Sequence, residues 1–241
     1  MEKYRIDVLL SKKLNISREK ASKIIKDEKV FFNNSICKCN LKLTLDEFES
    51  IEVLESDFLK YVSRAGLKLE KALEIFDINV KNKIALDVGS STGGFTHCLL
   101  LNDIEKVYAV DTGTLQMDIT IKENNKVNLF ENTNILDFNC ELVDIITIDV
   151  SFVSTTKIME KVLTLLKPDG GVILLLKPQF EVGKKYLNKK GVVKDSKTTL
   201  KTKENLFLFY EAIGFKIVNE ITSPILGKDG NTEFLIHLKR R

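Results

Sequence analysis

The feature that most constrains this sequence is a short apolar segment that runs directly into a turn of small residues. Residues 84–88 are apolar apart from Asp87, the turn occupies residues 89–94, and an apolar helical pattern follows over residues 95–101. A buried strand, a tight glycine turn and a helix start form the nucleotide-binding turn of α/β proteins, because small residues let the backbone approach a ligand. The N–H groups at the helix start are free to bind it.

An acidic residue stands where such a domain uses one. The next predicted strand, residues 107–110, ends at Asp111, which lies 22 residues after Gly89. An acid at about 20 residues from the turn accepts hydrogen bonds from ribose hydroxyls. The turn reads Gly-x-x-x-Gly-Gly, which is neither the dinucleotide-binding pattern nor that of a P-loop NTPase. The acid at Asp87 suits a ligand that carries an amine better than one that carries a pyrophosphate.

These observations favour S-adenosylmethionine over NAD as the cofactor, because it carries an amino group and a sulfonium but no phosphate. The expected cofactor contacts are Asp87, Gly89, Ser90, Thr92, Gly93, Gly94, Phe95 and Asp111. Asn134 and Asp137 follow the third strand and are further candidates for contacts with the adenine. A loop-capping role for these two residues is an equally open interpretation.

Apolar runs alternate with helical patterns through the rest of the chain. An amphipathic helix is predicted from Gly66, with Leu69, Leu73 and Phe76 on its apolar face. Further strands are predicted at residues 144–150, 172–177, 215–220 and 234–238, and further helices at 155–166 and 199–214. Continuous apolar strands between helices predict a largely parallel sheet that is covered on both faces.

Residues 1–56 are expected to form a separate small module. Helices are predicted from Arg5 and over residues 18–27, the second capped by Asn15 or Ser17. A strand over 30–32, a turn at Asn33-Asn34 and loosely alternating strand-like residues between Leu41 and Val53 follow. Residues 55–62 show no clear period, so the linker is placed at 57–63 and the larger domain at 64–241.

Basic residues are concentrated in two segments. Residues 1–45 carry eleven Lys or Arg against five Asp or Glu, and residues 177–203 carry nine Lys against two acids. Two such patches suit a polyanion, although lysine-rich solvated faces are the alternative. The net charge of +3 for the whole chain does not decide between them.

The first module resembles the S4 RNA-binding domain. The resemblance rests on Arg5 to Leu10, Ser17 to Ala21, Ile25, Val30 and Asn33, with Glu28 and Asn34 where such a domain typically has glycine. It implies contacts with the phosphates and sugars of a structured RNA. A helical hairpin that only docks on the larger domain is the alternative. Across the whole chain, the expected RNA contacts are Arg5, Arg18, Lys20, Lys23, Arg64, Lys184 and Lys185.

Four charged residues are expected to meet at one edge of the sheet. Asp149 and Lys177 each follow a predicted core strand, Lys68 lies near the start of the amphipathic helix, and Glu233 comes just before the last strand. Ligands of open α/β sheets bind at the carboxyl ends of the strands. A structural ion pair between Asp149 and Lys177 is the alternative interpretation.

The segments around these residues resemble the TlyA family, over nearly the whole chain. They are Tyr61 to Leu69, Asp87 to Phe95, Asp149 to Ser154, Lys177 to Glu181, Gly191 to Val193 and Gly230 to Leu235. The resemblance implies an S4 domain joined to an FtsJ-like methyltransferase that methylates a ribose 2′-hydroxyl of ribosomal RNA, on cytidine, with S-adenosylmethionine. The expected fold is therefore a Rossmann-like class I methyltransferase domain with a small N-terminal α+β S4-like domain.

The resemblance and the strand positions together suggest roles for the four residues. Lys177 is expected to be the base, and Asp149 to orient it. Lys68 is expected to favour the neutral form of Lys177 or to steady the developing alkoxide, and Glu233 to orient Lys68 or the substrate. Most of the rate enhancement is expected from holding the hydroxyl and the methyl group together.

Other classes of function have less support. No apolar run approaches the roughly 20 residues of a membrane helix, and the first residues lack the apolar segment of a signal peptide, so a cytoplasmic protein is expected. Cys37 and Cys39 lack zinc-site spacing, and we expect no metal. Ser151 and Ser154 lack the glycine pattern of a serine hydrolase. The alternatives kept are a membrane-active protein, which the family's other name, haemolysin A, suggests, and a ribosome assembly factor that binds S-adenosylmethionine without catalysis.

Overall fold

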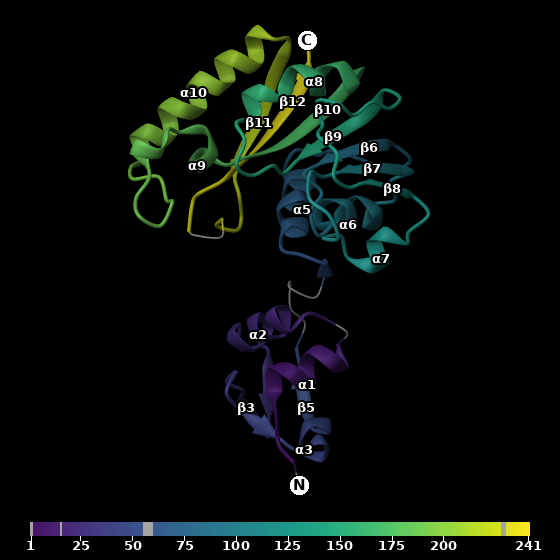
Figure 1. The fold of residues 1–241 in the computed structure, drawn as a ribbon, viewed down its shortest axis with the longest axis vertical. Helices are drawn as coiled ribbons and strands as arrows, with labels where there is room; N and C mark the ends of the chain where they lie inside the picture. The colour runs from purple at the N-terminus through teal and green to yellow at the C-terminus, as the bar shows by residue number, and fades with distance from the viewer. Residues whose placement is uncertain (1, 15, 55–59, 228–229) are drawn as a thin grey trace. The chain divides into compact units, whose positions relative to one another are not determined.

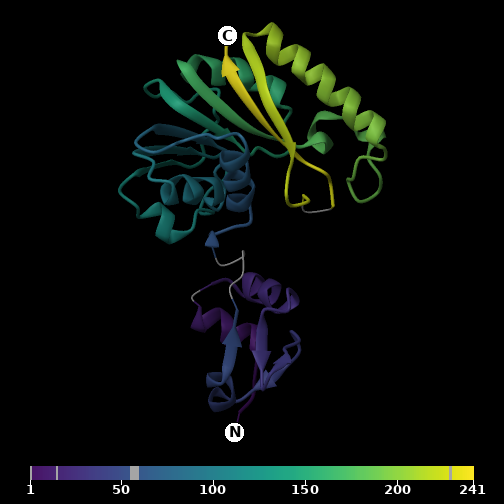
Figure 2. The ribbon, with the colours of Figure 1, turned by 180° about the vertical axis from the view of Figure 1, so that it is seen from behind.

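The computed structural model describes residues 2–14, 16–54, 60–227 and 230–241. The chain divides into two compact units, Met1–Tyr61 and Val62–Arg241, which are drawn from opposite sides in Figures 1 and 2. The predicted linker, residues 57–63, spans this division, and its residues 57–59 lie outside the described residues.

The first unit is a small α+β module. Its elements are β1 (Tyr4–Arg5), α1 (Ile6–Lys13), α2 (Arg18–Lys26), β2 (Val30–Phe32), β3 (Ser35–Ile36), β4 (Lys42–Leu43), α3 (Leu45–Glu49) and β5 (Ile51–Val53). Helices α1 and α2 pack together, and Ile6, Leu10 and Ile24 are fully buried between the elements. The sheet order is β3-β2-β5, and β1 pairs with β4.

Local signals set the turns and caps of this unit. Asn33 and Asn34 both have positive φ and close the β2–β3 hairpin, as predicted. Ser17 caps α2 by accepting a hydrogen bond from the Lys20 N–H, whereas Asn15, the other predicted cap, lies outside the described residues.

The loosely extended pattern predicted from Leu41 to Val53 is wrong at its centre. Residues Leu45–Glu49 form helix α3, because Thr44 and Glu47 make a capping box in which each side chain accepts from the other's backbone N–H. Phe48 lies on this helix and is buried, so it packs into the core although it does not belong to a strand.

The second unit is a seven-stranded sheet with helices beside it. Its elements before the midpoint are α5 (Ala65–Ile75), β6 (Ile84–Val88), α6 (Gly94–Leu101), β7 (Lys106–Val110), α7 (Ile119–Lys122), β8 (Val127–Phe130) and β9 (Val143–Ile148). After it come the 3₁₀ helix η1 (Thr155–Lys157), α8 (Met159–Leu165), β10 (Leu166–Leu176), α9 (Pro178–Glu181), η2 (Lys184–Tyr186), α10 (Ser196–Ala212), β11 (Phe215–Thr222) and β12 (Phe234–Arg240).

The strand order is β11-β12-β10-β9-β6-β7-β8. Strands β8, β7, β6, β9 and β10 are mutually parallel, and β12 is antiparallel to both of its neighbours. Helices α5 and α6 lie together near β6 to β8, while α10 runs along β11 (Figure 1). The prediction of a largely parallel α/β sheet is confirmed.

The structure changes several predicted boundaries. The helix expected over residues 155–166 is η1 followed by α8, and β10 begins at Leu166, with a register shift between Leu166 and Gly171. Strand β9 ends at Ile148 and β10 at Leu176, so that Asp149 and Lys177 are the first residues beyond their strands.

Candidate active site

Four of the predicted site segments meet at one edge of the sheet because their strands are parallel. The glycine turn follows β6, Asp111 follows β7, Asp149 follows β9 and Lys177 follows β10. Strand β12 runs the other way, so its first residues reach the same edge. Phe234 pairs with Leu176, which brings Glu233 beside Lys177 in the register.

The turn after β6 requires glycine at two positions. Gly89 has a φ of 81°, and a Cβ there would lie 2.7 Å from the backbone oxygen of Asp149. Gly93 has a φ of 87° and precedes α6. The Gly89 N–H donates to the Val110 carbonyl at 2.8 Å, which fixes the turn against β7. Side chains are therefore excluded where the backbone must pass close to the end of β9.

Asp87 is buried beneath this turn. Its carboxylate accepts hydrogen bonds from the Thr96 hydroxyl at 2.6 Å and from the Thr147 hydroxyl at 2.8 Å. Burial raises the pKa of Asp87 to about 6, although the two hydroxyls act in the opposite direction. The contacts describe a brace between β6, α6 and β9, and the predicted contact with a cofactor amine remains a prediction.

Asp111 faces the turn. Its Oδ2 accepts from the Ser91 N–H at 2.8 Å, and its Oδ1 accepts from the Gly113 N–H at 2.6 Å. A carboxylate has about four acceptor positions, so two stay available for ribose hydroxyls. Thr92 is exposed, Phe95 is buried, and the buried Ser90 hydroxyl has no hydrogen-bond partner among the described residues.

Asn134 and Asp137 are exposed in the loop after β8. That loop touches the Asp111 segment, because the Thr133 N–H donates to the Asp111 carbonyl at 2.9 Å. The Asn134 side chain accepts from the Leu136 N–H at 3.1 Å. A loop-capping contact of Asn134 is therefore present, and the adenine contacts stay a prediction.

Asp149 and Lys177 form an ion pair. Lys177 Nζ lies 2.6 Å from Asp149 Oδ1 and donates to the Ser151 hydroxyl at 3.0 Å. Asp149 Oδ1 accepts no well-directed hydrogen bond among the described residues, so charge holds the pair together. Both side chains are mostly buried but reach the surface.

Lys68 and Glu233 form a second pair, which is more deeply buried. Lys68 Nζ donates to Glu233 Oε2 at 2.6 Å across 165 residues of sequence. Gln179, two residues after Lys177, donates to Glu233 Oε1 at 3.4 Å. The side chain of Gln179 thus links the segment that carries Lys177 to the second pair.

An aromatic pair beside Lys177, in which Phe152 is exposed and Phe180 is half-buried, was not predicted. The ring centroids of Phe152 and Phe180 are 4.9 Å apart, and Lys177 Nζ lies 5.9 Å from the Phe180 centroid. Phe152 is 91% exposed and has a φ of 65°. A bulky residue is rarely found in that conformation. The sequence signal for this pair is that both phenylalanines lie in segments that resemble the TlyA family, Asp149 to Ser154 and Lys177 to Glu181.

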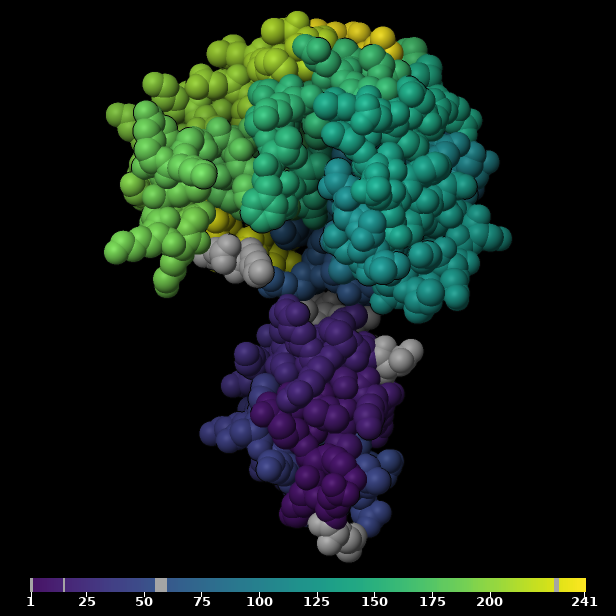
Figure 3. Space-filling model, in the orientation of Figure 1, coloured from purple at the N-terminus to yellow at the C-terminus, as the bar shows by residue number. Residues whose placement is uncertain are grey.

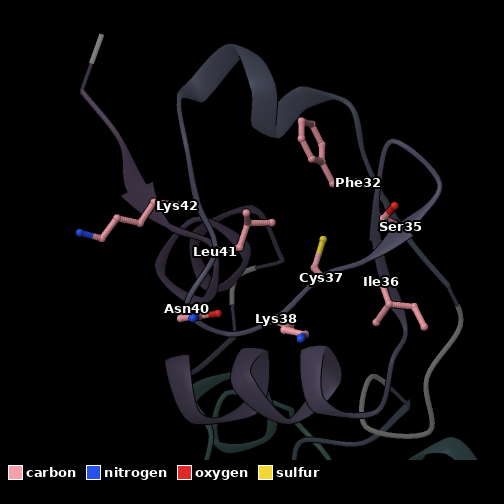
Figure 4. Close-up of a pocket in the computed structure, with 8 residues that line it drawn as sticks. All are labelled: Phe32, Ser35, Ile36, Cys37, Lys38, Asn40, Leu41 and Lys42. Atoms are coloured by element: carbon pink, nitrogen blue, oxygen red, sulfur yellow. The ribbon is translucent and has the colours of Figure 1, made fainter.

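The second unit is hollowed on the face seen in Figure 3, between the green atoms of its later segments and the teal atoms of its earlier ones. A cavity of about 490 Å³ lies instead in the first unit, lined among others by Phe32, Cys37 and Leu41. The Lys42 side chain extends away from it (Figure 4). This cavity holds none of the predicted catalytic or cofactor-binding residues.

The predicted RNA contacts in the first unit already have partners within the protein. Arg5 and Arg18 both donate to the buried carboxylate of Asp7, at 3.0–3.1 Å and 2.9 Å. The ammonium of Lys20 donates to the Tyr61 carbonyl at 2.7 Å, and that of Lys23 to Glu19 at 2.7 Å. Arg5, Arg18 and Lys23 keep about half of their side-chain surface exposed.

The predicted RNA contacts in the second unit lie on different elements. Arg64 is half-buried directly before α5. Lys184 and Lys185 are exposed in η2, and Lys185 lies 4.9 Å from the Tyr186 ring centroid. The segment that follows η2 is bound by the side-chain amide of Asn231. The amide oxygen accepts from the Val193 N–H and the amide nitrogen donates to the Gly191 carbonyl, both at 3.1 Å.

Across the described segments, no helix combines the length and apolar character needed to cross a membrane. In the same segments, no group of three or more His, Cys, Asp or Glu side chains is arranged to hold a metal ion.

Comparison with known proteins supports a single family. The sequence profile described as FtsJ-like methyltransferase matches residues 61–240. The "23S rRNA (cytidine-2′-O)-methyltransferase TlyA" of Campylobacter jejuni is 40% identical over 97% of this chain and 98% of its own length. "Hemolysin A" of Brachyspira hyodysenteriae is 41% identical over 92% of this chain and 93% of its own length.

A solved structure agrees with these sequence matches. A protein of Streptococcus thermophilus assigned as a hemolysin has a TM-score of 0.76 and 36% identity over 100% of this chain and 89% of its own. Both hemolysin names and the methyltransferase name therefore belong to proteins that are similar to this chain over nearly its whole length.

Proposed function

This chain belongs to the FtsJ-like methyltransferase family, and on that premise we propose that it methylates the ribose 2′-hydroxyl of a cytidine in ribosomal RNA. The observation that carries the proposal is the meeting of two lysine–acid pairs, Lys177 with Asp149 and Lys68 with Glu233, next to the glycine turn. A protein that only binds RNA has no need of such a set.

The residues at the turn fit S-adenosylmethionine. Glycine at position 89 keeps the turn free of a side chain, the buried Ser90 hydroxyl offers an unused polar atom, and Asp111 retains acceptor positions for ribose hydroxyls. These residues would hold the cofactor, which supplies the methyl group when it is bound. Lysines that bind phosphate are absent from residues 87–95, as expected for a ligand without phosphate.

Lys177 is the proposed base. A ribose hydroxyl is a weak acid, and it must lose its proton as it accepts the methyl group. The contacts with Asp149 and Ser151 hold the lysine amine in one place. In this role the Lys177 amine accepts the proton that the hydroxyl loses as the methyl group is transferred. Lys68, held by Glu233, is the cation proposed to steady the developing alkoxide.

The aromatic pair beside Lys177 suits a nucleobase. Proteins that act on RNA nucleotides stack unpaired bases on exposed aromatic rings. Phe152 presents an almost fully exposed ring, and its strained backbone persists only where the surroundings hold it. We propose that the base of the target nucleotide stacks there while its ribose faces Lys177.

RNA binding is assigned to both units. In the first unit, Glu28 and Asn34 have a φ of 60°, so they adopt the conformation that glycine provides in an S4 domain. This supports the S4-like assignment, with Arg5, Arg18, Lys20 and Lys23 as its contacts. In the second unit, Arg64, Lys184 and Lys185 are the proposed contacts with the RNA backbone.

Mass spectrometry of ribosomal RNA tests the proposed function. Purified protein and S-adenosylmethionine are incubated with unmodified ribosomal subunits, with the Lys177→Ala variant alongside. We expect a 2′-O-methylcytidine from the wild type only, and S-adenosylmethionine affinity of the variant within a few-fold of the wild type.

Two outcomes would contradict this proposal. No product on either subunit, with cofactor binding intact, would favour an assembly factor. Leakage of liposomes caused equally by the wild type and by Lys177→Ala would favour a membrane-active protein.

A further inference from the structure

We propose that Glu181 is a positioning residue for methyl transfer, which fixes Lys177 relative to Asp149; this inference rests on the proposed function. Glu181 is the last residue of α9, the short helix that begins immediately after Lys177. Its carboxylate is bound by the segment that follows Asp149, so the two catalytic strand ends are joined at a second place.

Both carboxylate oxygens of Glu181 accept hydrogen bonds from this segment. Oε2 accepts from the Ser154 hydroxyl at 2.6 Å, and Oε1 accepts from the Thr155 N–H at 2.8 Å and from the Thr155 hydroxyl at 2.7 Å. Hydrogen bonds to an ionised acceptor are short and stronger than neutral ones. Three of them on one side chain specify both its position and its orientation.

A further hydrogen bond, between Thr155 and Tyr210, extends this cluster into the core. The Thr155 hydroxyl has one proton, which it donates to Glu181, so the contact of 2.6 Å between the Thr155 and Tyr210 oxygens requires Tyr210 to donate. Tyr210 is fully buried on α10, and burial raises the pKa of its hydroxyl, which therefore keeps its proton. Helix α9 lies beside α10 (Figure 1), which gives the cluster a fixed support.

The two strand ends are thus connected at three levels. Lys177 contacts Asp149, Phe180 contacts Phe152, and Glu181 contacts Ser154 and Thr155. Strands β9 and β10, which lead into these segments, are neighbours in the sheet. Of these three contacts, that of Glu181 is the furthest from Lys177 along the chain. It is also the contact that continues, through Thr155, to the buried Tyr210. Its removal leaves α9 free to shift, and Lys177 would shift with it.

The test uses the full-length protein on unmodified ribosomal subunits, with turnover counted per molecule that binds S-adenosylmethionine. In Glu181→Ala, we expect kcat to fall by about 10- to 100-fold, because displacing a catalytic group by about 1 Å lowers the rate by a factor of up to about 100. Cofactor affinity should stay within two-fold, since the cofactor residues follow β6 and β7. Glu181→Gln keeps an oxygen toward Thr155 and should recover most of the lost turnover. Tyr210→Phe should lower kcat less than Glu181→Ala does.

Glu141→Ala is the matched control. Like Glu181, Glu141 accepts hydrogen bonds from two residues, Tyr108 at 2.8 Å and Lys106 at 2.9 Å, but it lies before β9, at the other end of the strand. It should leave kcat unchanged.

Three results would overturn the inference: kcat of Glu181→Ala within two-fold of the wild type, cofactor affinity that falls together with kcat, or Glu181→Gln as slow as Glu181→Ala. Inactivity of the wild type would overturn the proposed function itself, which separates the two failures.

Discussion

At the scale of single residues, Asp87 shows how burial alters the chemistry of a side chain. Its carboxylate has no exposed surface and depends on two threonine hydroxyls for hydrogen bonds. Burial without a cationic partner favours the protonated form, which raises the pKa of Asp87 to about 6. The unfolded chain has an ordinary aspartate at this position, so folding and protonation are linked.

We therefore predict that Asp87 destabilises the fold as the pH rises from 4 to 7. Between these values the native state holds a proton that the unfolded state has released, so the free energy of unfolding falls with pH, by up to about 3 kcal/mol. Asp87→Asn cannot ionise and lacks this contribution. Urea denaturation of both proteins at several pH values measures the difference, which should grow in favour of the variant. A difference that stays constant with pH would contradict the prediction.

At the scale of elements, helices α1 and α2 are joined through one buried acid. Asp7 on α1 accepts from Arg5, which precedes this helix, and from Arg18 at the start of α2. Burial alone would raise the pKa of Asp7, but the hydrogen bonds from the two arginines outweigh it and lower the pKa. The carboxylate thus stabilises the unit above its ordinary pKa, and this contribution is lost as the pH falls through the lowered value.

Asp7→Asn should therefore destabilise the helix pair at neutral pH, by about 1.5 to 3 kcal/mol, the usual loss for a hydrogen bond to a charged group. Hydrogen exchange of the α1 and α2 amides in the full-length protein measures it. Glu19→Gln is the control, because its exposed pair with Lys23 is worth at most about 1 kcal/mol. Equal effects of the two substitutions would show that Asp7 does not join the helices.

At the scale of the whole molecule, the protein is two compact units with different proposed tasks. The residues assigned to cofactor binding and catalysis are all in the second unit, whereas basic residues proposed to contact RNA are in both. A protein of this design should lose RNA affinity without losing cofactor affinity when the first unit is removed.

We predict that residues 62–241 alone bind S-adenosylmethionine as the full chain does but bind ribosomal RNA more weakly. Each lost phosphate contact should reduce the slope of log affinity against log salt by about 0.7 to 0.9. Salt titrations of both proteins measure this slope. Lys184→Ala with Lys185→Ala serves for comparison, since it should reduce the slope with the first unit in place. Unchanged RNA affinity after the truncation would contradict the S4-like assignment.

Much of the site was open to prediction from the sequence because its signals are local. The apolar run that ends at Val88, the glycines at 89 and 93, and the acid after the next strand each depend on residues close in the chain. The carboxyl ends of parallel strands must meet at one edge, so Asp149 and Lys177 could be placed together before any contact was known. The Asn33-Asn34 turn was predictable for the same reason, since two residues alone determine it.

Other features depended on packing between distant segments. The family resemblance left open whether Glu233 orients Lys68 or the substrate, and the tertiary structure shows its contact with Lys68 across 165 residues. Only burial turns Asp87 into a brace held by Thr96 and Thr147. Exposure is likewise a property of the folded surface, which is why Phe152 reads as an ordinary core residue until its neighbours are placed. The sequence by itself determined the class of fold and the edge at which the chemistry lies. Tertiary packing decided which side chains touch there, because contact between distant residues is set by the arrangement of whole elements.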